Sequence, residues 1–415
     1  MSSVRNYLLV TLAYWGFTLT DGALRMLVLL HFHRLGYSPI NLAFLFLLYE
    51  LFGIVTNLVG GWLGARLGLR VTLFAGLALQ VIALAMLTQL NPDWTPAIVV
   101  AFVMASQALS GISKDLTKMS AKSAIKTLVP DDRQGLLFRW VALLTGSKNA
   151  LKGLGFFLGG FLLSTFGFAG ALWGMAGGLV VILILSAVSL PKDVGRAKEK
   201  PLFSSILSHT REINILSAAR FFLFGSRDAW FVVGLPIFLY ASLGWTFTQV
   251  GGYMAFWVIG YGAVQALSPQ LLSLGLKKGA APTGKHAMGW AFALFPIPAL
   301  IALAVGYNIH PSVAVLGGLI LFGVVFAVNS AVHSYLIVAY AQGDRVAMNV
   351  GFYYMSNAGG RLLGTLLSGV VFQWYGLVGC LWTSALLILA SGVIARWLPD
   401  DQPRQGLTEL VPPVG

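Results

Sequence analysis

Long hydrophobic runs, separated by short stretches rich in glycine, proline and charged residues, follow one another along the chain. An apolar run of about 20 residues forms a helix long enough to cross roughly 30 Å of hydrocarbon. Each run bounded by such residues is therefore predicted to be one membrane-spanning helix. The pattern predicts twelve spans, near residues 7–32, 40–62, 70–90, 96–120, 136–162, 167–190, 213–241, 247–272, 286–307, 312–340, 346–373 and 376–397.

The composition excludes an ordinary soluble protein. Of the 415 residues, 57% are hydrophobic and 10% are charged, whereas a soluble domain carries about 25% charged residues. The chain is expected to be an all-α integral membrane protein. Its first run carries Asp21 and Arg25 and lacks a small-residue cleavage site, which favours a retained span over a signal peptide. The single cysteine, Cys380, excludes an intrachain disulfide and disfavours a thiolate metal site.

The net charge of +13 is distributed unevenly between the two sides of the predicted membrane. Basic residues such as Arg66, Lys198 and Arg345 fall in short loops on one side, whereas the loops of the other side hold Arg34 alone. Lys and Arg accumulate in cytoplasmic loops. Both termini are therefore expected to be cytoplasmic, and membrane topology rather than nucleic-acid binding accounts for the basic composition.

The two halves of the chain resemble each other at an offset of about 208 residues, which indicates an internal repeat. The matches keep one register, which makes chance similarity between oily segments a poor explanation. The matching pairs are "RLGYSPINLAF" (34–44) with "SLGWTFTQVGG" (242–252), "FGFAGALW" (166–173) with "YGLVGCLW" (375–382), Gly155 with Gly364, and Gly160 with Gly369.

The longest polar stretch, residues 191–212, separates two sets of six spans. The sequence thus predicts an N-terminal six-helix bundle over residues 1–190, a cytoplasmic central loop, and a C-terminal six-helix bundle with a short cytoplasmic tail over residues 213–415. Two pseudo-symmetric bundles of this kind form an alternating-access transporter, with the substrate site near the middle of the membrane where the halves meet.

The segment "GGWLGARLGLR" (60–70), between the second and third spans, resembles the loop signature of the major facilitator superfamily, Gly-x-Leu-x-Asp-Arg-x-Gly-Arg-Arg. The resemblance implies the fold of that superfamily and a gating role for this loop. Ala65 stands where the signature has its aspartate, and Leu69 replaces a basic residue, so a gating charge pair that uses the aspartate is in doubt here. The matching residues are Gly61, Leu63, Arg66, Gly68 and Arg70.

Ionisable side chains within the predicted spans are costly, because a charge near the centre of a membrane helix costs roughly 2.5–3.5 kcal/mol. Bases outnumber acids in the spans by four, so internal pairing cannot neutralise them all. Such groups face a bundle interior and mark a substrate path, here one suited to a multiply charged anion. The bases are Arg25, Lys114, Lys118, Lys148, Lys152, Arg220, Arg227 and Arg361, and the acids are Asp21, Glu50, Asp115 and Asp228.

Two of these cations occupy equivalent positions in the repeat. Lys148 lies near the middle of the fifth span, with Lys152 one turn further on the same face. The repeat maps Lys152 onto Arg361 in the eleventh span and Lys148 onto Asn357. We therefore expect Lys148, Lys152 and Arg361 to bind substrate, with Lys152 and Arg361 holding one anion from both sides. The alternative is that each pairs with a buried acid for structure.

Other charged pairs leave more than one interpretation open. Asp21 and Arg25 are four residues apart and can pair, so Arg25 is either a structural partner or a ligand. Arg227 and Asp228 are adjacent and point about 100° apart on a helix, so they are not expected to share a face. Arg227 is then a candidate substrate ligand. Arg220 lies nearer the cytoplasmic side and is expected to snorkel toward it.

Four lysines recur at four-residue intervals in "SKDLTKMSAKSAIK" (113–126). They extend over about 18 Å of helix, too far for one small ligand. Lys122 and Lys126 are expected at the cytoplasmic boundary. Lys114 and Lys118 are deep enough to line the inner half of the path, where they would attract an anion from the cytoplasm.

Proton coupling would require an acid within a span. Glu50 has no cation within four residues and is the first candidate, followed by Asp21 and Asp228. The equally acceptable alternative is that Glu50 is the structural partner of a lysine in another span. We find no paired acids, activated nucleophile or metal-ligand set at helix spacing, so no enzyme, catalytic residue, metal or cofactor is expected.

Two further segments, "AYWGFTLTDGALRMLVLLHFHRLGYSP" (13–39) and "SGISKDLTKMSAKSAIKTLVPDD" (110–132), resemble the ArsJ family of organoarsenical exporters from bacterial arsenic-resistance operons. The resemblance implies a monomer of the bacterial inner membrane that exports 1-arseno-3-phosphoglycerate, with glyceraldehyde-3-phosphate dehydrogenase as the functional partner that makes this substrate. Export would then confer arsenate resistance. The alternative is a permease for organophosphate, phosphate or another organic anion, because the residues themselves indicate only the charge class.

Overall fold

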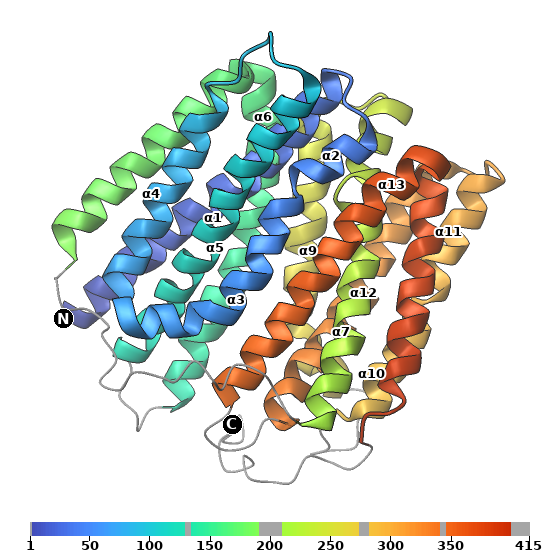
Figure 1. Cartoon of the computed structure of the whole chain (residues 1–415). Coiled ribbons are helices and arrows are strands. Elements are labelled where there is room, and N and C mark those ends of the chain that lie inside the picture. Colours follow the sequence, from blue (N-terminus) through green and yellow to red (C-terminus); the bar gives the residue numbers. More distant parts are fainter. Residues whose placement is uncertain (1, 129–133, 191–209, 274–281, 341–345, 400–415) are drawn as a thin grey trace.

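Helices make up all the regular structure of the described residues, which in this computed structural model are 2–128, 134–190, 210–273, 282–340 and 346–399. The helices run side by side as two bundles (Figure 1). The first bundle contains α1 (Ser2–Arg34), α2 (Pro39–Leu45), α3 (Leu47–Leu67), α4 (Leu69–Leu87), α5 (Pro96–Leu128) and α6 (Gln134–Ser189). The second contains α7 (Arg211–Phe231), α8 (Gly234–Ile237), η2 (Phe238–Ser242), α9 (Phe247–Ser273), α10 (Gly284–Leu294), α11 (Pro296–Gly306), α12 (Pro311–Tyr340) and α13 (Val346–Ala395).

The predicted twelve spans are confirmed, although several helices are divided or joined. In the described residues, nine helices are long and apolar enough to cross a membrane, and two of these, in α6 and α13, have double length. Each double helix reverses direction at one glycine, Gly167 with φ 67° and Gly376 with φ 61°. Left-handed backbone is readily adopted by glycine because it has no Cβ. The two glycines are equivalent in the sequence repeat, and α1 supplies the remaining span.

Pairs of repeat-equivalent glycines also position the helices within each bundle. A Cβ on Gly155 of α6 would lie 2.4 Å from the Leu19 carbonyl oxygen of α1. A Cβ on Gly364 of α13 would lie 2.5 Å from the Gly225 carbonyl oxygen of α7. Small residues allow membrane helices to approach this closely. The helix pairs α1–α6 and α7–α13 therefore pack in the same way, each through a close approach at an equivalent glycine.

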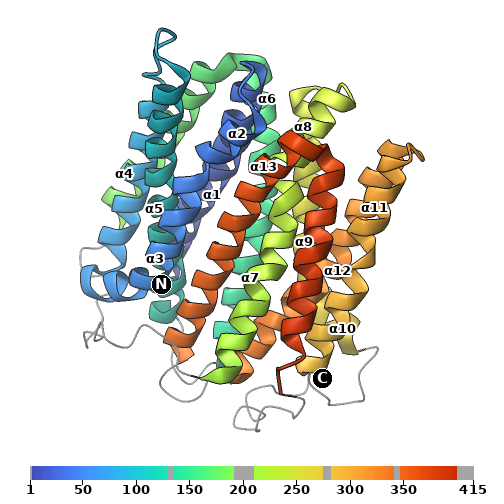
Figure 2. The ribbon, with the colours of Figure 1, turned by 45° about the vertical axis from the view of Figure 1, so that its right-hand side comes forward.

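The two bundles touch each other through a second equivalent pair of glycines. A Cβ on Gly160 would lie 2.3 Å from the Phe247 carbonyl oxygen of α9, and one on Gly369 would lie 2.5 Å from the Pro39 carbonyl oxygen of α2. Both contacts lie near the end of the molecule opposite the start of α1, and Figure 2 shows α2 and α13 adjacent there. At that end of the molecule, the two bundles are therefore in direct backbone contact.

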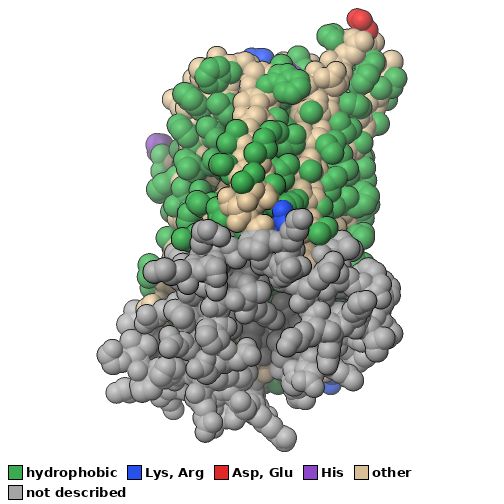
Figure 3. Space-filling view, turned by 90° about the vertical axis from the view of Figure 1, so that its left-hand side faces the viewer, with side chains coloured by type: hydrophobic (Ala, Val, Ile, Leu, Met, Phe, Trp, Pro, Cys, Tyr) green, Lys and Arg blue, Asp and Glu red, His purple; other side chains and the backbone are tan. Residues whose placement is uncertain are grey.

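The outer surface suits a lipid environment. Figure 3 shows a face whose described part is covered almost entirely by hydrophobic side chains. By contrast, the span formed by α7, α8 and η2 is enclosed by the rest of the protein, with 83% of its most apolar window buried. Arg220 and Asp228 of α7 are therefore interior groups, whereas Arg211 at its start is exposed. The predicted central loop lies mostly outside the described residues, so the boundaries of the two bundles stay a prediction.

Candidate functional site

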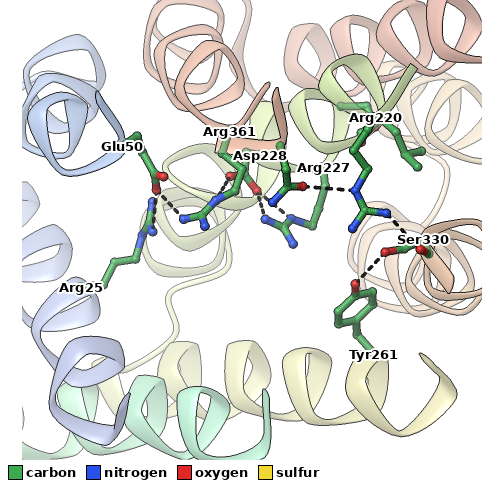
Figure 4. A network of polar contacts seen from close by, with 11 residues as sticks. Arg25, Glu50, Arg220, Arg227, Asp228, Tyr261, Ser330 and Arg361 are labelled. Atoms are coloured by element: carbon green, nitrogen blue, oxygen red, sulfur yellow. Dashed lines mark hydrogen bonds and ion pairs between the residues drawn. The ribbon is translucent and has the colours of Figure 1, made fainter. Parts of the chain in front are cut away.

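Five charged side chains from both bundles form one chain of ion pairs, which we call the ion-pair network (Figure 4). Arg25 of α1 places Nη1 3.2 Å from Oε1 of Glu50 on α3. Arg361 of α13 contacts the same oxygen through Nη2 at 2.5 Å. Its Nε lies 3.4 Å from Oδ2 of Asp228 on α7, and Asp228 Oδ1 pairs with Arg227 Nη2 at 2.5 Å. The contact between Glu50 and Arg361 joins the two bundles.

Two lysines add positive charge beside the network without pairing with an acid. Lys114 of α5 and Lys152 of α6 are both close enough to Glu50 to interact with it electrostatically. Neither forms an ion pair with a carboxylate of the described residues. The Lys114 ammonium instead lies 4.0 Å from the centre of the Tyr49 ring. We call Arg25, Glu50, Lys114, Lys152 and Arg361 the Glu50 cluster, in which four cations lie around Glu50. Asp115 and Asp21 also interact electrostatically with Lys114, and Asp21 does so with Lys152.

The cations of the network are more accessible than the acids they contact. The side chains of Arg361 and Arg227 are 16% and 15% exposed, whereas those of Glu50 and Asp228 are 0% and 2% exposed. The Arg25 side chain is likewise 10% exposed, whereas that of its partner Glu50 is 0% exposed. A molecule that entered the interior would therefore meet guanidinium groups first. Such a surface attracts anions and repels cations.

The pairing of Arg25 differs from the sequence expectation. Arg25 does not pair with Asp21, four residues earlier; instead, Asp21 Oδ1 accepts a hydrogen bond of 2.7 Å from the Tyr49 hydroxyl. Glu50 has no cation within four residues of the chain, and its two partners, Arg25 and Arg361, both come from other spans. This agrees with the alternative in which Arg361 pairs with a buried acid for structure. Sequence spacing reveals only neighbours on one helix, and here the partners are brought together by helix packing.

The expectation that Arg227 and Asp228 do not share a face is wrong. The Arg227 side chain folds back along α7, and its Nε donates a hydrogen bond of 2.7 Å to Asp228 Oδ1. The angle between adjacent Cα–Cβ directions is about 100°, but a long flexible side chain can close it. Arg227 is thus partly neutralised, while its remaining surface stays accessible.

The lysines of α5 also differ in their surroundings from what the sequence spacing suggested. Lys118 is held by Asp115 at 2.5 Å and by the Asn57 side-chain oxygen at 2.8 Å, so it is an internal structural partner as well as a candidate ligand. Lys148 is half-buried on α6, one turn from Lys152. The side chains of Lys122 and Lys126 lie outside the described residues. Lys114 is therefore the lysine of this row that joins the Glu50 cluster.

Arg220 was not among the expected ligands and does not snorkel. It is 4% exposed, which places it inside the second bundle. Its Nη1 donates a hydrogen bond of 3.0 Å to the Ser330 carbonyl, and its Nε donates one of 3.3 Å to the Asn357 side chain. The sequence did contain a signal for this interior role: Arg220 is a basic residue within a span, and no acid lies within one helical turn of it.

The predicted gating loop has a structural role at its described positions. Gly68, with φ 80°, begins α4 after the end of α3. Arg70 donates a hydrogen bond of 3.0 Å to the Ala187 carbonyl in the last turn of α6. A basic group is stabilising at a helix C-terminus, so Arg70 ties the ends of two spans together. The side chains of Gly61 and Arg66 lie outside the described residues.

Comparison with known proteins agrees with this architecture. A family model described as Major Facilitator Superfamily matches residues 7–331. Two crystal structures of a POT family transporter share 16% sequence identity with this chain, one in complex with thioalcohol conjugated peptide and one with 5-aminolevulinic acid. Their TM-scores are 0.72 and 0.73, and each comparison covers 94% of this chain and 95% of the other.

At this identity the likeness to the two structures shows the fold alone. None of the curated proteins compared with the sequence matches it. The family model, however, covers more than half of the chain and includes the loop signature and the first bundle. This match indicates a multi-pass secondary transporter rather than an enzyme. The chain therefore belongs to the major facilitator superfamily.

Proposed function

We propose that this transporter carries a small, multiply charged organic anion out of the cell, and that the anion is 1-arseno-3-phosphoglycerate. The observation that carries the proposal is the Glu50 cluster, where four cations converge and only the two arginines form ion pairs with Glu50. Lys114 and Lys152 pair with no described acid. A substrate with several negative charges would neutralise the excess, whereas a cationic substrate would increase it.

The types of cation suit tetrahedral oxyanions. Arg25 and Arg361 offer planar guanidinium groups that can donate two parallel hydrogen bonds, and Lys114 and Lys152 offer mobile point charges. In the interior these groups lose most of their hydration, so burial of charge is favourable only when a partner is present. We propose Lys152, Lys114, Arg25, Arg361 and Arg227 as substrate ligands.

Lys148 of α6 and Lys118 of α5 are proposed to line the path by which the anion reaches the Glu50 cluster. Both are half-buried and lie one turn from a member of the Glu50 cluster. We assign them to the approach of the anion rather than to its final position. The proposed orientation places both termini in the cytoplasm of a bacterial cell and the protein, as a monomer, in the inner membrane.

Glu50 is the proposed proton carrier. Its Oε1 contacts both Arg25 and Arg361, while its buried Oε2 has no hydrogen-bond partner. A substrate anion that binds the same two guanidinium groups would compete with Glu50, and the displaced carboxylate would then take up a proton. Asp21 and Asp228 are the alternatives, each held by one or more hydrogen bonds.

The identity of the anion and the direction of transport rest on the resemblance to organoarsenical exporters. In that setting glyceraldehyde-3-phosphate dehydrogenase forms the substrate from arsenate, and export removes arsenic from the cell. The second candidate, an organophosphate or phosphate permease, is favoured by the same cationic cluster. The two candidates differ only in which anion is transported.

Inverted membrane vesicles provide the test. The dehydrogenase, its substrate aldehyde, NAD and arsenate are supplied outside the vesicles, so that 1-arseno-3-phosphoglycerate forms continuously, and arsenic inside is measured with and without a proton gradient. We expect gradient-dependent arsenic accumulation that the Lys152→Ala variant loses. The matched control Arg34→Gln changes an exposed arginine outside the cluster and should accumulate arsenic normally.

Parallel uptake of labelled phosphate and glycerol 3-phosphate separates the two candidates. Accumulation of these anions without arsenic would support the permease and overturn the arsenical assignment. Normal accumulation of arsenic by the Lys152→Ala, Lys148→Ala and Arg361→Ala variants, at matched protein levels, would overturn the proposed ligand set.

A further inference from the structure

A second group of polar residues lies in the interior of the C-terminal bundle, centred on Arg220. The Tyr261 hydroxyl and the Gln265 amide of α9 each donate a hydrogen bond of 3.3 Å to the Ser330 hydroxyl of α12. Arg220 binds the carbonyl of the same serine. The Asn357 side-chain oxygen of α13 accepts a hydrogen bond from Arg220 Nε. Four helices therefore contribute to one polar site, which we call the Arg220 site.

Among the described residues, no acid forms an ion pair that balances the positive charge of the Arg220 site. Arg220 forms no ion pair with a carboxylate of the described residues, and its Nη2 makes no hydrogen bond to them. His333 lies close enough to interact electrostatically with it. That histidine is fully buried, and neither of its ring nitrogens has a partner. An unpaired guanidinium and an unpartnered imidazole are groups that an oxyanion would satisfy.

The Arg220 site is aligned with the ion-pair network. Arg220 and Arg227 are seven residues apart on α7, which is two turns or about 10.5 Å on the same face. Both guanidinium groups contact the Phe224 ring, at 4.0 Å for Arg220 and 5.1 Å for Arg227. Figure 4 shows the row of charged groups from Arg25 through Arg361 and Arg227 continuing to Arg220, with Tyr261 beside it.

We propose that the Arg220 site is a second anion subsite, and that the transporter recognises short-chain substrates with an anionic group at each end. One group binds at the Glu50 cluster and Arg227, and the other binds Arg220, His333 and the Tyr261 hydroxyl. The inference rests on the proposed function, because it assigns the far end of the same substrate. It makes Arg220 a residue that determines specificity for two-ended anions.

A matched pair of stable probes tests this subsite: propane-1,3-diyl bisphosphate has a phosphate at both ends, and propyl phosphate has one. Their binding to the purified full-length chain is measured by titration calorimetry. We expect the wild type to bind the bisphosphate about tenfold more tightly than the monophosphate. Arg220→Gln should remove this preference and leave the affinity for propyl phosphate unchanged, while Arg220→Lys should keep part of it.

Lys152→Ala should weaken binding of both probes, which distinguishes the two subsites. Tyr261→Phe, a milder change, should reduce the preference and keeps the test decisive if Arg220→Gln does not fold. Arg34→Gln, which changes an exposed arginine outside both subsites, is the matched control and should bind as the wild type does.

Equal affinity of the wild type for both probes, or an Arg220→Gln variant with an undiminished preference, would overturn the second subsite while leaving the first in place. Failure of the folded wild type to bind either probe would instead overturn the proposed function on which the subsite rests.

Discussion

Lys152 of α6 and Arg361 of α13 occupy equivalent positions in the two halves, yet their surroundings differ. Arg361 contacts Glu50 and Asp228, one from each bundle, whereas Lys152 pairs with no described carboxylate. The helices that carry them pack alike, through Gly155 and Gly364. The repeat thus governs how the backbone packs, while the acids, which are not repeated, decide which cation is neutralised and which is available.

The largest effect is expected for Arg361→Ala. The change leaves Asp228 with Arg227 alone and Glu50 with Arg25 alone, and breaking a buried ion pair costs about 3–5 kcal/mol. We expect transport to be lost and the melting temperature of the purified protein to fall, as measured by thermal unfolding in detergent. Arg361→Lys, which retains the charge, should recover part of the stability. An Arg361→Ala protein as stable as the wild type would contradict the bridging role.

Glu50→Gln should have the next largest effect. The neutral amide removes the carboxylate that Arg25 and Arg361 share, so the positive charges of the Glu50 cluster repel one another more strongly. We expect a smaller loss of thermal stability than for Arg361→Ala, together with arsenic uptake that no longer responds to a proton gradient. The check is uptake in inverted vesicles at matched protein levels. Retained dependence on the gradient would transfer the proton-carrier role to Asp21 or Asp228.

Lys152→Ala should separate affinity from stability. Because Lys152 forms no ion pair with a described carboxylate, and repulsion by Arg361 and Arg25 opposes its attraction to Asp21, its removal should change the melting temperature only slightly. The apparent affinity for the transported anion should fall about tenfold, or roughly 1.4 kcal/mol. Vesicle kinetics and thermal unfolding of the same preparation measure both quantities. A fall in stability as large as that of Arg361→Ala would remove the distinction between these two residues.

The smallest effects are expected at the two equivalent turns. Gly167→Ala and Gly376→Ala each place a Cβ on a left-handed residue with no neighbour within 4 Å of that Cβ. Only backbone strain opposes the change, at about 1–3 kcal/mol for each residue, because a positive φ with ψ near 180° is a conformation nearly restricted to glycine. Both variants should lower the melting temperature by similar small amounts and transport normally. Clearly unequal shifts would show that the two turns are not equivalent.

Much of the fold could be predicted because hydrophobic length and glycine position are local properties of the chain. The twelve spans and the two-bundle repeat follow from them, and Gly155, Gly160, Gly364 and Gly369 occupy equivalent contacts. What the pattern does not contain is the division of spans into shorter helices, such as α2 with α3 or α10 with α11. The α10–α11 division falls directly before Pro296, whose missing N–H interrupts the helix.

The candidate site was predictable as a set of residues but not as a set of contacts. The sequence identified Arg25, Glu50, Arg227, Asp228 and Arg361 as interior charges. It did not predict that Glu50 joins the two bundles or that Arg227 folds back on its neighbour. Ion pairs form between side-chain tips, which long flexible side chains can place several ångströms from the helix face on which they begin.

The sequence by itself determined that the chain spans the membrane, that it is built twice from one six-helix pattern, and that its interior contains more cations than acids. These properties follow from the residue types present and from their periodicity along the chain, neither of which depends on how the helices pack. The tertiary structure alone decided which cations are neutralised, since that depends on distances between helices far apart in the chain. It also enclosed Arg220 among the helices of the second bundle, where its guanidinium and that of Arg227 both meet the Phe224 ring.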